Sequence, residues 1–345
     1  MDCFPQGLCY TFHTPHPSSV GKEPKAPMKY KTLLIYNPTA GPWDMTRTLK
    51  RLAEYMNKCD WAMEVVQTEH PGDATHYARR AVEEGSDIVL VAGGDGTINE
   101  AANGLVGTST ALGIVPVGTG NILAHQLHMP LLSLTAPLYV RDVGEALCQS
   151  RIQRVDAGVI NKRYFVCWAG LGLDAEITAY MEPRPRLAKR FRTIPYIIAG
   201  FTVAAEFRGV RSRLVIEGRT FRTRALMALA SNIQLYAAFF NIAPRARMDD
   251  GLLDIYVFKG LGFPYIMRHL LHLFRGQHQY DPKVMHALAR TMTVHTTPSV
   301  AVHLDGDPYG DTPAAISIEA GKLLLLVPPQ APPSLFSKPP ERILE

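Results

Sequence analysis

The chain has 345 residues, of which 47% are hydrophobic and 19% charged, and its formal net charge is +5 at pH 7. This length allows two domains with separate cores, and the balance of apolar and charged residues excludes an intrinsically disordered chain. The modest positive charge permits contact with phosphates or an anionic membrane surface, but it does not indicate a nucleic-acid-binding protein.

The cysteine pattern and the lengths of the apolar runs favour a cytoplasmic protein. The 5 cysteines are scattered and contain no CxxC pair, which argues against a disulfide framework or a zinc site. A membrane-spanning helix needs about 20 apolar residues. The longest candidate, Ile194–Ala205, is about half that length and contains Pro195 and Gly200. Peripheral contact with the inner face of the membrane stays open.

The first part of the chain alternates predicted strands and helices. Residues 1–27 have no continuous apolar run, so we expect a disordered leader and not a secretory signal. The following residues, 28–154, are predicted to form a doubly wound α/β domain with a parallel sheet. Its strands are predicted at Thr32–Tyr36, Ala62–Thr68, Ile88–Ala92 and Ala111–Val115, and its helices at Thr46–Asn57, Asp73–Glu84 and Ile98–Leu105.

The rest of the chain is dominated by short strand-like runs separated by turn residues. Residues 155–328 are therefore predicted to form a second domain, a β-sandwich that binds the substrate. The strand-like runs are Tyr164–Trp168, Arg213–Ile216, Ala225–Ala230, Leu253–Phe258 and Met292–Thr296. Two helical interruptions are expected, at Arg186–Phe207 and Tyr265–Arg275. Residues 329–345, rich in proline, are predicted to be a disordered tail.

Two glycine-rich turns follow consecutive predicted strands, and each leads into a helix. They are Gly93-Gly94-Asp95-Gly96-Thr97 and Pro116-Val117-Gly118-Thr119-Gly120-Asn121. Glycines let the backbone approach a phosphate, and the free N–H groups of a helix N-terminus point at the anion. One such turn would indicate only a tight corner. Two in succession at the same edge of a parallel sheet favour a nucleotide-phosphate site.

Several nucleotide-binding motifs are absent from the sequence. There is no GxxxxGK[ST] segment, which excludes a P-loop enzyme, and neither turn has the G-x-G-x-x-G pattern of a dinucleotide fold. The protein-kinase motifs are missing as well.

The motifs resemble those of the diacylglycerol kinase and sphingosine kinase superfamily, particularly its bacterial soluble lipid kinases. The resemblance begins with Gly93–Glu100 followed by Pro116–Asn121 and extends, in the family's order, over most of residues 31–328. The further matching segments are Asn37–Gly41, Thr68 with Pro71–Ala74, Ala169–Ala175, Met248–Asp254 and Leu304–Asp307. The resemblance implies an ATP-dependent lipid kinase with its active site in a cleft between an α/β domain and a β-sandwich.

The resemblance also implies a role for each matching residue. Asp95 would lie near the reacting phosphate, where it would hold Mg²⁺ or orient the lipid hydroxyl. Asp250 would bind a second, structural Mg²⁺ together with the main-chain carbonyls of Arg247 and Leu252, which are oxygen ligands suited to a hard cation. The implied ATP-binding residues are Asn37, Thr68, Gly93, Gly94, Asp95, Gly96, Thr97, Asn99, Glu100, Gly118, Thr119 and Asn121.

The last acidic motif departs from the family pattern. The family usually has Asp-Gly-Glu, with the glutamate as proton acceptor, whereas this chain has Asp305-Gly306-Asp307. Aspartate keeps the carboxylate but shortens its reach by one methylene group, and a misplacement of about 1 Å can cost on the order of 100-fold in rate. We expect Asp307 or Asp305 to act as base or metal ligand. The alternative is a weakened or inactive enzyme that still binds nucleotide.

The identity of the acceptor is left open by the sequence. Diacylglycerol, monoacylglycerol, sphingoid bases and phosphatidylglycerol are all candidate lipids, and the oligomeric state, including a homodimer, is undetermined. A basic segment, residues 184–192, precedes the apolar stretch Ile194–Ala205 and would suit anionic headgroups or simply face solvent. The alternatives to a lipid kinase are an NAD kinase-like enzyme, which also has a GGDGT turn, and a non-catalytic nucleotide- or lipid-binding regulator.

Overall fold

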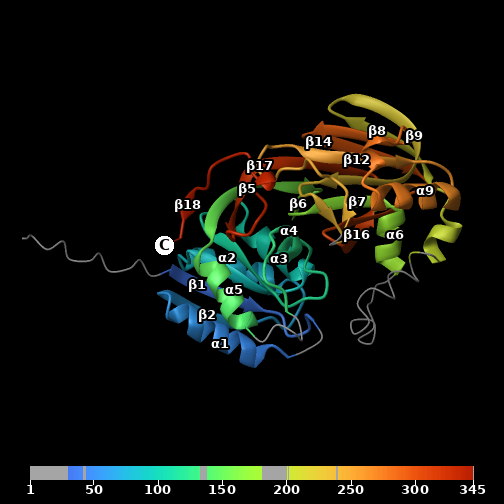
Figure 1. The fold of residues 1–345 in the computed structure, drawn as a ribbon. Helices are drawn as coiled ribbons and strands as arrows, with labels where there is room; N and C mark the ends of the chain where they lie inside the picture. Colours follow the sequence, from blue (N-terminus) through green and yellow to red (C-terminus); the bar gives the residue numbers. More distant parts are fainter. Residues whose placement is uncertain are drawn as a thin grey trace, which may run out of the picture.

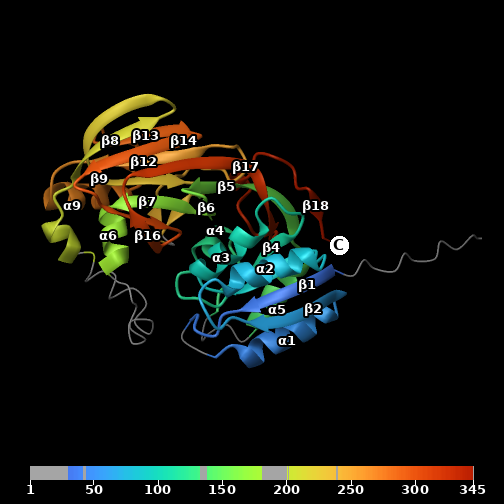
Figure 2. The same cartoon turned by 180° about the vertical axis from the view of Figure 1, so that it is seen from behind.

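The computed structural model describes residues 30–41, 44–132, 138–180, 200, 202–237 and 240–344, which form two regions in chain order (Figure 1). The first is an α/β region and the second a mostly antiparallel β region with few helices. The view from behind shows the same division, with the blue and cyan elements grouped apart from the orange strands (Figure 2). The predicted leader, residues 1–27, and the basic segment, residues 184–192, lie outside the described residues.

The first region is built on four parallel strands in the order β2-β1-β3-β4. The central strands β3 and β4 are buried along their whole length, as expected when helices cover both faces. Helix α1 packs against α5, and α2 packs against α3. These strands are β1 (Tyr30–Tyr36), β2 (Trp61–Gln67), β3 (Ile88–Gly93) and β4 (Ala111–Pro116). The helices are α1 (Thr46–Asn57), α2 (Asp73–Glu83), α3 (Asp95–Leu105), α4 (Ile122–Gln126) and α5 (Tyr139–Cys148).

The sequence periodicity located the elements of this region closely. The helix predicted at Thr46–Asn57 coincides with α1, because Leu49, Leu52 and Met56 form one buried stripe. The largest difference is the start of α3, which is Asp95 and not Ile98. The glycine turn itself forms the first turn of this helix, so the polar residues that the sequence assigned to a loop are helical.

The second region is a sandwich of antiparallel strands around its own apolar core. The predicted fold class, an α/β domain followed by a β-sandwich, is confirmed. Its long strands are β5 (Arg151–Ile160), β8 (Val210–Ile216), β9 (Arg219–Ser231), β12 (Leu253–Lys259), β13 (Val284–Ala289), β14 (Thr291–Thr297) and β17 (Ala314–Val327). Shorter strands are β6 (Arg163–Phe165), β7 (Trp168–Gly172), β10 (Leu235–Tyr236), β11 (Phe240–Asn241), β15 (Ala301–Leu304) and β16 (Asp307–Asp311).

The strand-like run Tyr164–Trp168 is not one strand. It is divided between β6 and β7, and the N–H groups of Val166, Cys167 and Trp168 bind the carboxylate of Asp305. The Asp305 side chain thus binds the backbone of a loop at the place where the apolar sequence predicts a continuous strand.

Helices are few in the second region. The described residues include α6 (Leu173–Tyr180), a helical segment at residues 202–206, α9 (Phe263–Phe274) and the short turn η1 (His278–Tyr280). The predicted helix Tyr265–Arg275 is confirmed by α9, whereas most of Arg186–Phe207 lies outside the described residues. In the part of the chain that the structure describes, no helix is long and apolar enough to cross a membrane.

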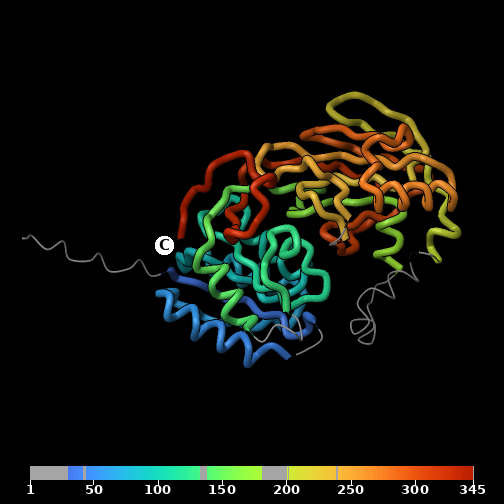
Figure 3. The backbone as a smooth tube through the Cα atoms, viewed as in Figure 1, coloured from blue at the N-terminus to red at the C-terminus, as the bar shows by residue number. Residues whose placement is uncertain are grey.

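Strand β17 joins the two regions. It pairs with β14 of the sandwich near its start and runs parallel to β4 near its end, where Leu324 lies beside Ala111. Along its length it is also antiparallel to β5. The backbone trace shows this red strand passing from the sandwich to the α/β region (Figure 3). The strand therefore fixes the two regions relative to each other.

The prediction of a disordered tail at residues 329–345 is wrong for its described part. The tail forms a short turn, η2 (Pro333–Leu335), and strand β18 (Arg342–Ile343), which pairs with β5. Its prolines suggested disorder, but Leu335 is 0% exposed and Leu344 4% exposed in the core of the α/β region. Two isolated leucines give no periodic signal in a proline-rich segment.

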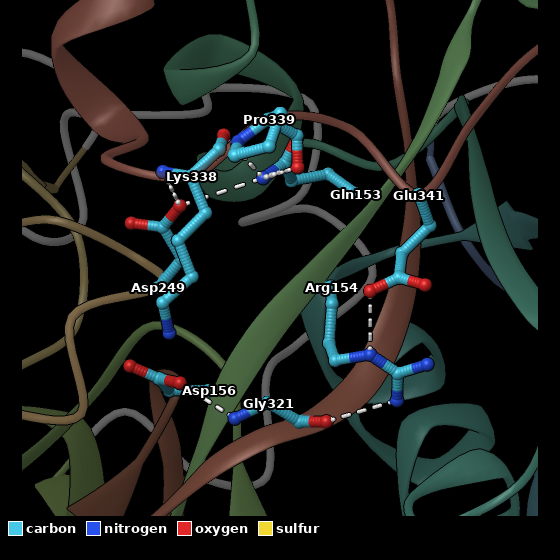
Figure 4. Close-up of polar contacts among 8 residues, drawn as sticks. All are labelled: Gln153, Arg154, Asp156, Asp249, Gly321, Lys338, Pro339 and Glu341. Atoms are coloured by element: carbon cyan, nitrogen blue, oxygen red, sulfur yellow. Dashed lines mark hydrogen bonds and ion pairs between the residues drawn. The ribbon is translucent and has the colours of Figure 1, made fainter.

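A buried carboxylate holds the same tail (Figure 4). Asp249 accepts hydrogen bonds from the Ser337 N–H at 2.7 Å, the Ser337 hydroxyl at 2.8 Å and the Lys338 N–H at 2.8 Å. Gln153 on β5 donates to the Lys338 carbonyl at 3.1 Å. The backbone groups that a free tail would leave to water are thus paired inside the protein.

Replacing Leu335 by alanine tests whether this tail is part of the core. We expect Leu335→Ala to lower the free energy of unfolding by about 2 to 5 kcal/mol, because it leaves a cavity at a fully buried site. Ile343→Ala is the control, since Ile343 is 63% exposed in the same tail and should change stability by less than about 0.5 kcal/mol. Equal denaturation midpoints for the two variants would contradict the packed tail.

Candidate active site

The two glycine turns lie against each other at the carboxyl ends of β3 and β4. A side chain on Gly118 would place its Cβ 2.7 Å from the Cα of Gly94, so this approach requires glycine. Gly94 is the N-cap of α3. Asn121 closes the second turn in a left-handed conformation, with φ of 52°, and its amide donates to the Gly118 carbonyl at 2.8 Å. The contact therefore brings the main-chain groups of the two glycine turns together at the carboxyl ends of β3 and β4.

Asp95 begins α3 and faces the second turn. Its Oδ1 accepts a hydrogen bond from the Ile122 N–H at 2.7 Å. Burial is the main cause that raises the pKa of Asp95 to about 6, and it acts against that hydrogen bond. The negative charges of Asp305 and Asp307 raise the pKa in the same direction. Three carboxylates therefore interact around the first turn of α3.

Asn37 and Thr68 follow the next two strands of the sheet. The amide of Asn37 donates to the Thr97 hydroxyl at 2.9 Å, which joins the end of β1 to α3. The Thr68 hydroxyl donates to the Tyr36 carbonyl at 3.5 Å and is almost buried. Like Gly93 and Gly118, these residues lie at the carboxyl edge of the parallel strands, where open α/β sheets bind ligands.

Glu100 holds a neighbouring loop. Its Oε2 accepts from the Gly72 N–H at 3.0 Å, and its carbonyl accepts from the Thr75 hydroxyl at 2.7 Å. Glu100 therefore fixes the turn that follows Thr68. These two hydrogen bonds position the loop, and direct contact of Glu100 with a nucleotide stays a prediction.

Asp305 lies where the two regions meet and is almost completely buried. Its carboxylate accepts from three consecutive main-chain N–H groups, Val166, Cys167 and Trp168, at 2.8 to 2.9 Å. It also accepts from the Asn99 amide of α3 at 2.8 Å. Burial raises the pKa of Asp305, while these hydrogen bonds lower it. With four donors, its carboxylate is committed to holding structure.

Asp307 lies directly on the first turn of α3. A Cβ on Gly96 would come within contact distance of the Asp307 carboxylate, so only glycine allows this approach. Asp307 begins β16, two residues after Asp305 turns the chain in a left-handed conformation with φ of 49°. The structure therefore separates the two aspartates that the sequence left as alternatives. Asp305 ties the two regions, and Asp307 faces the glycine turn beside Asp95.

The residues expected to hold a second metal are in a different turn, just before β12. One carboxylate oxygen of Asp250 accepts from the Leu252 N–H at 3.0 Å. Burial raises the pKa of Asp250, and nearby Asp156, Asp254 and Asp249 raise it as well. No described hydrogen bond joins this turn, which includes Arg247, to Asp95 or Asp307.

Two buried acidic residues were missed by the sequence reasoning. Asp156 on β5 accepts from the Gly321 N–H at 2.7 Å (Figure 4). It also accepts from the Gly251 N–H at 2.6 Å, and so holds the Asp250 turn against β17. Asp174, at the start of α6, pairs with His303 at 2.8 Å. Asp156 stands outside every motif, whereas Asp174 lies within the matching segment Ala169–Ala175, where the sequence assigned it no role.

Models of two protein families match this chain in succession. The diacylglycerol kinase catalytic domain matches residues 31–160, and the YegS C-terminal NAD kinase beta sandwich-like domain matches residues 168–327. The first model covers both glycine turns. The second covers Asp250, Asp305 and Asp307.

Curated relatives match most of the chain. A diacylglycerol kinase of Staphylococcus saprophyticus is 29% identical over 288 residues, which are 83% of this chain and 92% of that protein. A diacylglycerol kinase of Staphylococcus aureus strain MRSA252 is 28% identical over 289 residues, 83% of this chain and 89% of that protein.

Solved structures share the fold. A crystal structure titled as a diacylglycerol kinase from Bacillus anthracis strain Sterne covers 88% of this chain and 98% of its own, with TM-score 0.64 and 21% identity. Another structure from the same strain reaches TM-score 0.70 at 24% identity. The successive domain matches, the relatives and the fold agree, and the chain belongs to the diacylglycerol kinase family and is a lipid kinase.

Proposed function

We propose that this chain transfers the γ-phosphoryl group of ATP to the hydroxyl of a diacylglycerol-like lipid in a Mg²⁺-dependent reaction. The observation that carries the proposal is the contact between Asp307 and Gly96, which sets a carboxylate of the second region on the glycine turn of the first. Phosphoryl transfer needs positioning and charge stabilisation more than covalent help from the protein. A phosphate site with a facing carboxylate supplies both.

The glycine turns would bind the phosphates of ATP. Main-chain N–H groups at the start of α3 and in the Gly118–Asn121 turn are suited to anions, and the glycines leave room for close approach. Asn37 and Thr97 are bonded to each other at this edge and would lie beside the nucleotide. Thr68, Asn99 and Thr119 complete the set that we assign to the nucleotide side.

The carboxylates fit divalent cations. The raised pKa of Asp95 reflects burial and repulsion from Asp305 and Asp307, which a bound cation would offset. Asp95 would hold Mg²⁺ near the phosphates, where the ion neutralises charge on the transferred group. A second Mg²⁺ would depend on Asp250 and the carbonyls of Arg247 and Leu252. Within the described residues no three His, Cys, Asp or Glu side chains form a metal cluster, so carbonyl oxygens are essential there.

We assign the proton acceptor to Asp307 and a positioning role to Asp305. Asp305 has four hydrogen-bond donors on its carboxylate, and a proton taken from the lipid would disrupt them. Asp307 begins β16 and lies against Gly96, which is the side of the site where an acceptor hydroxyl would meet the γ-phosphate. A positioned base of this kind contributes roughly 100- to 10,000-fold in rate.

Asparagine substitutions separate these two roles. We expect Asp307→Asn to lower kcat by about 100-fold or more with an unchanged denaturation midpoint. Asp305→Asn should instead destabilise the fold by several kcal/mol, because a buried donor left without its acceptor costs about 1 to 3 kcal/mol. The measurements are steady-state kinetics and denaturant unfolding of both variants. A stable, inactive Asp305→Asn beside an active Asp307→Asn would reverse the assignment.

The shifted pKa of Asp95 predicts a pH dependence of stability without nucleotide or metal. The native pKa of about 6 is above the ordinary value of 3.8, so the native state keeps a proton that the unfolded state has lost. Stability therefore falls as pH rises from about 4 to 6 and stays lower above that window.

Asp95→Asn removes this cost and keeps an oxygen for the Ile122 N–H. We expect it to be more stable than the unmodified protein at pH 8, by on the order of 2 kcal/mol, and to gain little at pH 4. Asp73→Asn is the control of opposite sign, because hydrogen bonds from Glu69 and His70 lower the pKa of Asp73. Thermal unfolding in EDTA measures both. A loss of stability for Asp95→Asn at pH 8 would contradict the shift.

The acceptor is identified by direct assay. The purified protein is incubated with labelled ATP, Mg²⁺ and mixed micelles of diacylglycerol or sphingosine, or with NAD in solution, and Asp307→Asn serves as the blank. Label in phosphatidic acid is the expected result. Label in NAD would replace the lipid acceptor by a dinucleotide, and ATP binding without transfer to any lipid would favour a regulatory protein.

A further inference from the structure

Helix α9 exposes apolar side chains on its outward face. Ile266 and His269 point into the protein and are buried. On the outer side and one flank of the helix lie Phe263, Leu271 and Phe274, which are 37%, 47% and 67% exposed, and the Phe274 ring also contacts that of Phe240 at a centroid distance of 4.9 Å. Their spacing, together with the partly buried Met267 between them, forms one continuous stripe. A surface helix normally presents polar residues on this side, so the stripe indicates a partner.

Basic side chains surround the start of this helix. A shallow pocket of about 400 Å³ between β9 and α9 is lined by Arg224, Lys259 and Lys283, with no acidic residue among its lining. Leu261 and Tyr265 complete its apolar side.

The hairpin of β8 and β9 continues the basic surface with arginines that face one another. Arg211 is directly opposite Arg224, and Arg213 is directly opposite Arg222. The alternate residues of β8 are buried, so these arginines lie on the outer face of the sheet. Like charges placed directly across strands are destabilising. Arg224 donates to the carbonyls of Arg208 and Gly209, and an anionic partner would offset the repulsion between Arg213 and Arg222.

The nearby acidic groups leave this surface positive. Asp281 is buried and paired with Arg268 of α9 at 2.9 Å. Glu217, at the hairpin turn, accepts from the main-chain N–H groups of Arg290 and Thr291. Within the described ranges, no ion pair joins Arg213 or Arg222 to a carboxylate.

We propose that the outer stripe of α9 and the arginine face of β8–β9 together form a surface that docks onto anionic lipid bilayers. Aromatic and aliphatic side chains beside arginines suit the interface of a membrane, where the apolar groups enter the headgroup boundary and the cations meet lipid phosphates. A nucleic acid would use the arginines but not an aliphatic stripe. The proposal rests on the proposed function, since it names the surface that brings the kinase to its lipid.

The docking surface is physically connected to the site. Ile266 of α9 shares a small apolar cluster with Leu173 of α6 (Figures 1 and 2). The next residue of α6, Asp174, is bonded to His303, two residues before Asp305. A bilayer bound at α9 would therefore contact the end of the sandwich that is connected, through α6 and His303, to the Asp305–Asp307 turn.

Vesicle binding tests the surface independently of catalysis. The full chain is sedimented with vesicles of phosphatidylcholine, with and without phosphatidylglycerol. We expect binding only when phosphatidylglycerol is present, and a decrease with added salt. Arg213→Gln/Arg222→Gln should weaken that binding on the order of 10-fold or more. Leu271→Ser/Phe274→Ser should weaken it by a similar factor through lost apolar burial.

Matched variants on the α/β region are the controls. Arg47→Gln/Arg51→Gln removes the same charge from exposed positions of α1, and Val65→Ser/Leu138→Ser removes side chains that are 44% and 48% exposed. Both should bind vesicles like the unmodified protein. Docking variants that bind vesicles as well as the unmodified protein, or control variants that lose as much binding as the docking variants, would overturn the proposal.

The kinase assay separates this proposal from the proposed function. With a short-chain diacylglycerol that dissolves as monomers, the docking variants should retain full turnover, and with lipid in vesicles they should lose it in proportion to binding. A protein that binds vesicles through these residues but phosphorylates no lipid would contradict the kinase reaction alone. Vesicle turnover unchanged in the docking variants would contradict the docking surface alone.

Discussion

The buried carboxylate of Asp305 is the interaction on which the geometry of the site depends. It accepts three main-chain N–H groups from the connection between β6 and β7, and one amide from Asn99 in α3. A carboxylate that is buried without such donors costs free energy. The β6–β7 connection and helix α3 are therefore both fixed in position by their hydrogen bonds to Asp305. The helix begins with the glycine turn, and β16 begins two residues after Asp305. One side chain thus sets the position of Asp307 relative to Gly96.

Further buried aspartates secure the same arrangement from the other side of β17. Asp156 binds the turns at Gly251 and Gly321, and Asp249 binds the tail at Ser337. Strand β17 itself pairs with both regions. These ties make independent movement of the sandwich costly, because it would expose several charged groups that are now satisfied by main-chain donors. The sequence divides the chain into two regions, but the buried aspartates and their main-chain partners connect the two.

The sequence could predict what depends on local pattern, and it missed what depends on distant partners. Helix α1 and the glycine turns follow from spacing and from residues that need special backbone geometry. The division of Tyr164–Trp168 into two strands follows from Asp305, more than 130 residues away, which no local pattern reveals. The packed tail was missed for the same reason, because Leu335 and Leu344 are isolated in sequence and meet the core only after folding. The sequence also showed two aspartates in one motif, Asp305 and Asp307, but it did not show which carboxylate is engaged in hydrogen bonds that hold the structure.

The shorter acid at position 307 is consistent with the close approach of the two regions. A glutamate at this position would need the space that the Gly96 backbone fills, because the aspartate carboxylate already lies against that glycine. The hydrogen bond between Asn99 and Asp305 ties the residues that lead into β16 to α3, and the shorter side chain of Asp307 reaches the glycine turn there. Burial is the main cause that raises the pKa of Asp95 to about 6, and the nearby carboxylates of Asp305 and Asp307 raise it further. The two protonation states of this group are thus equally populated only near pH 6, and a bound cation would favour the ionised form.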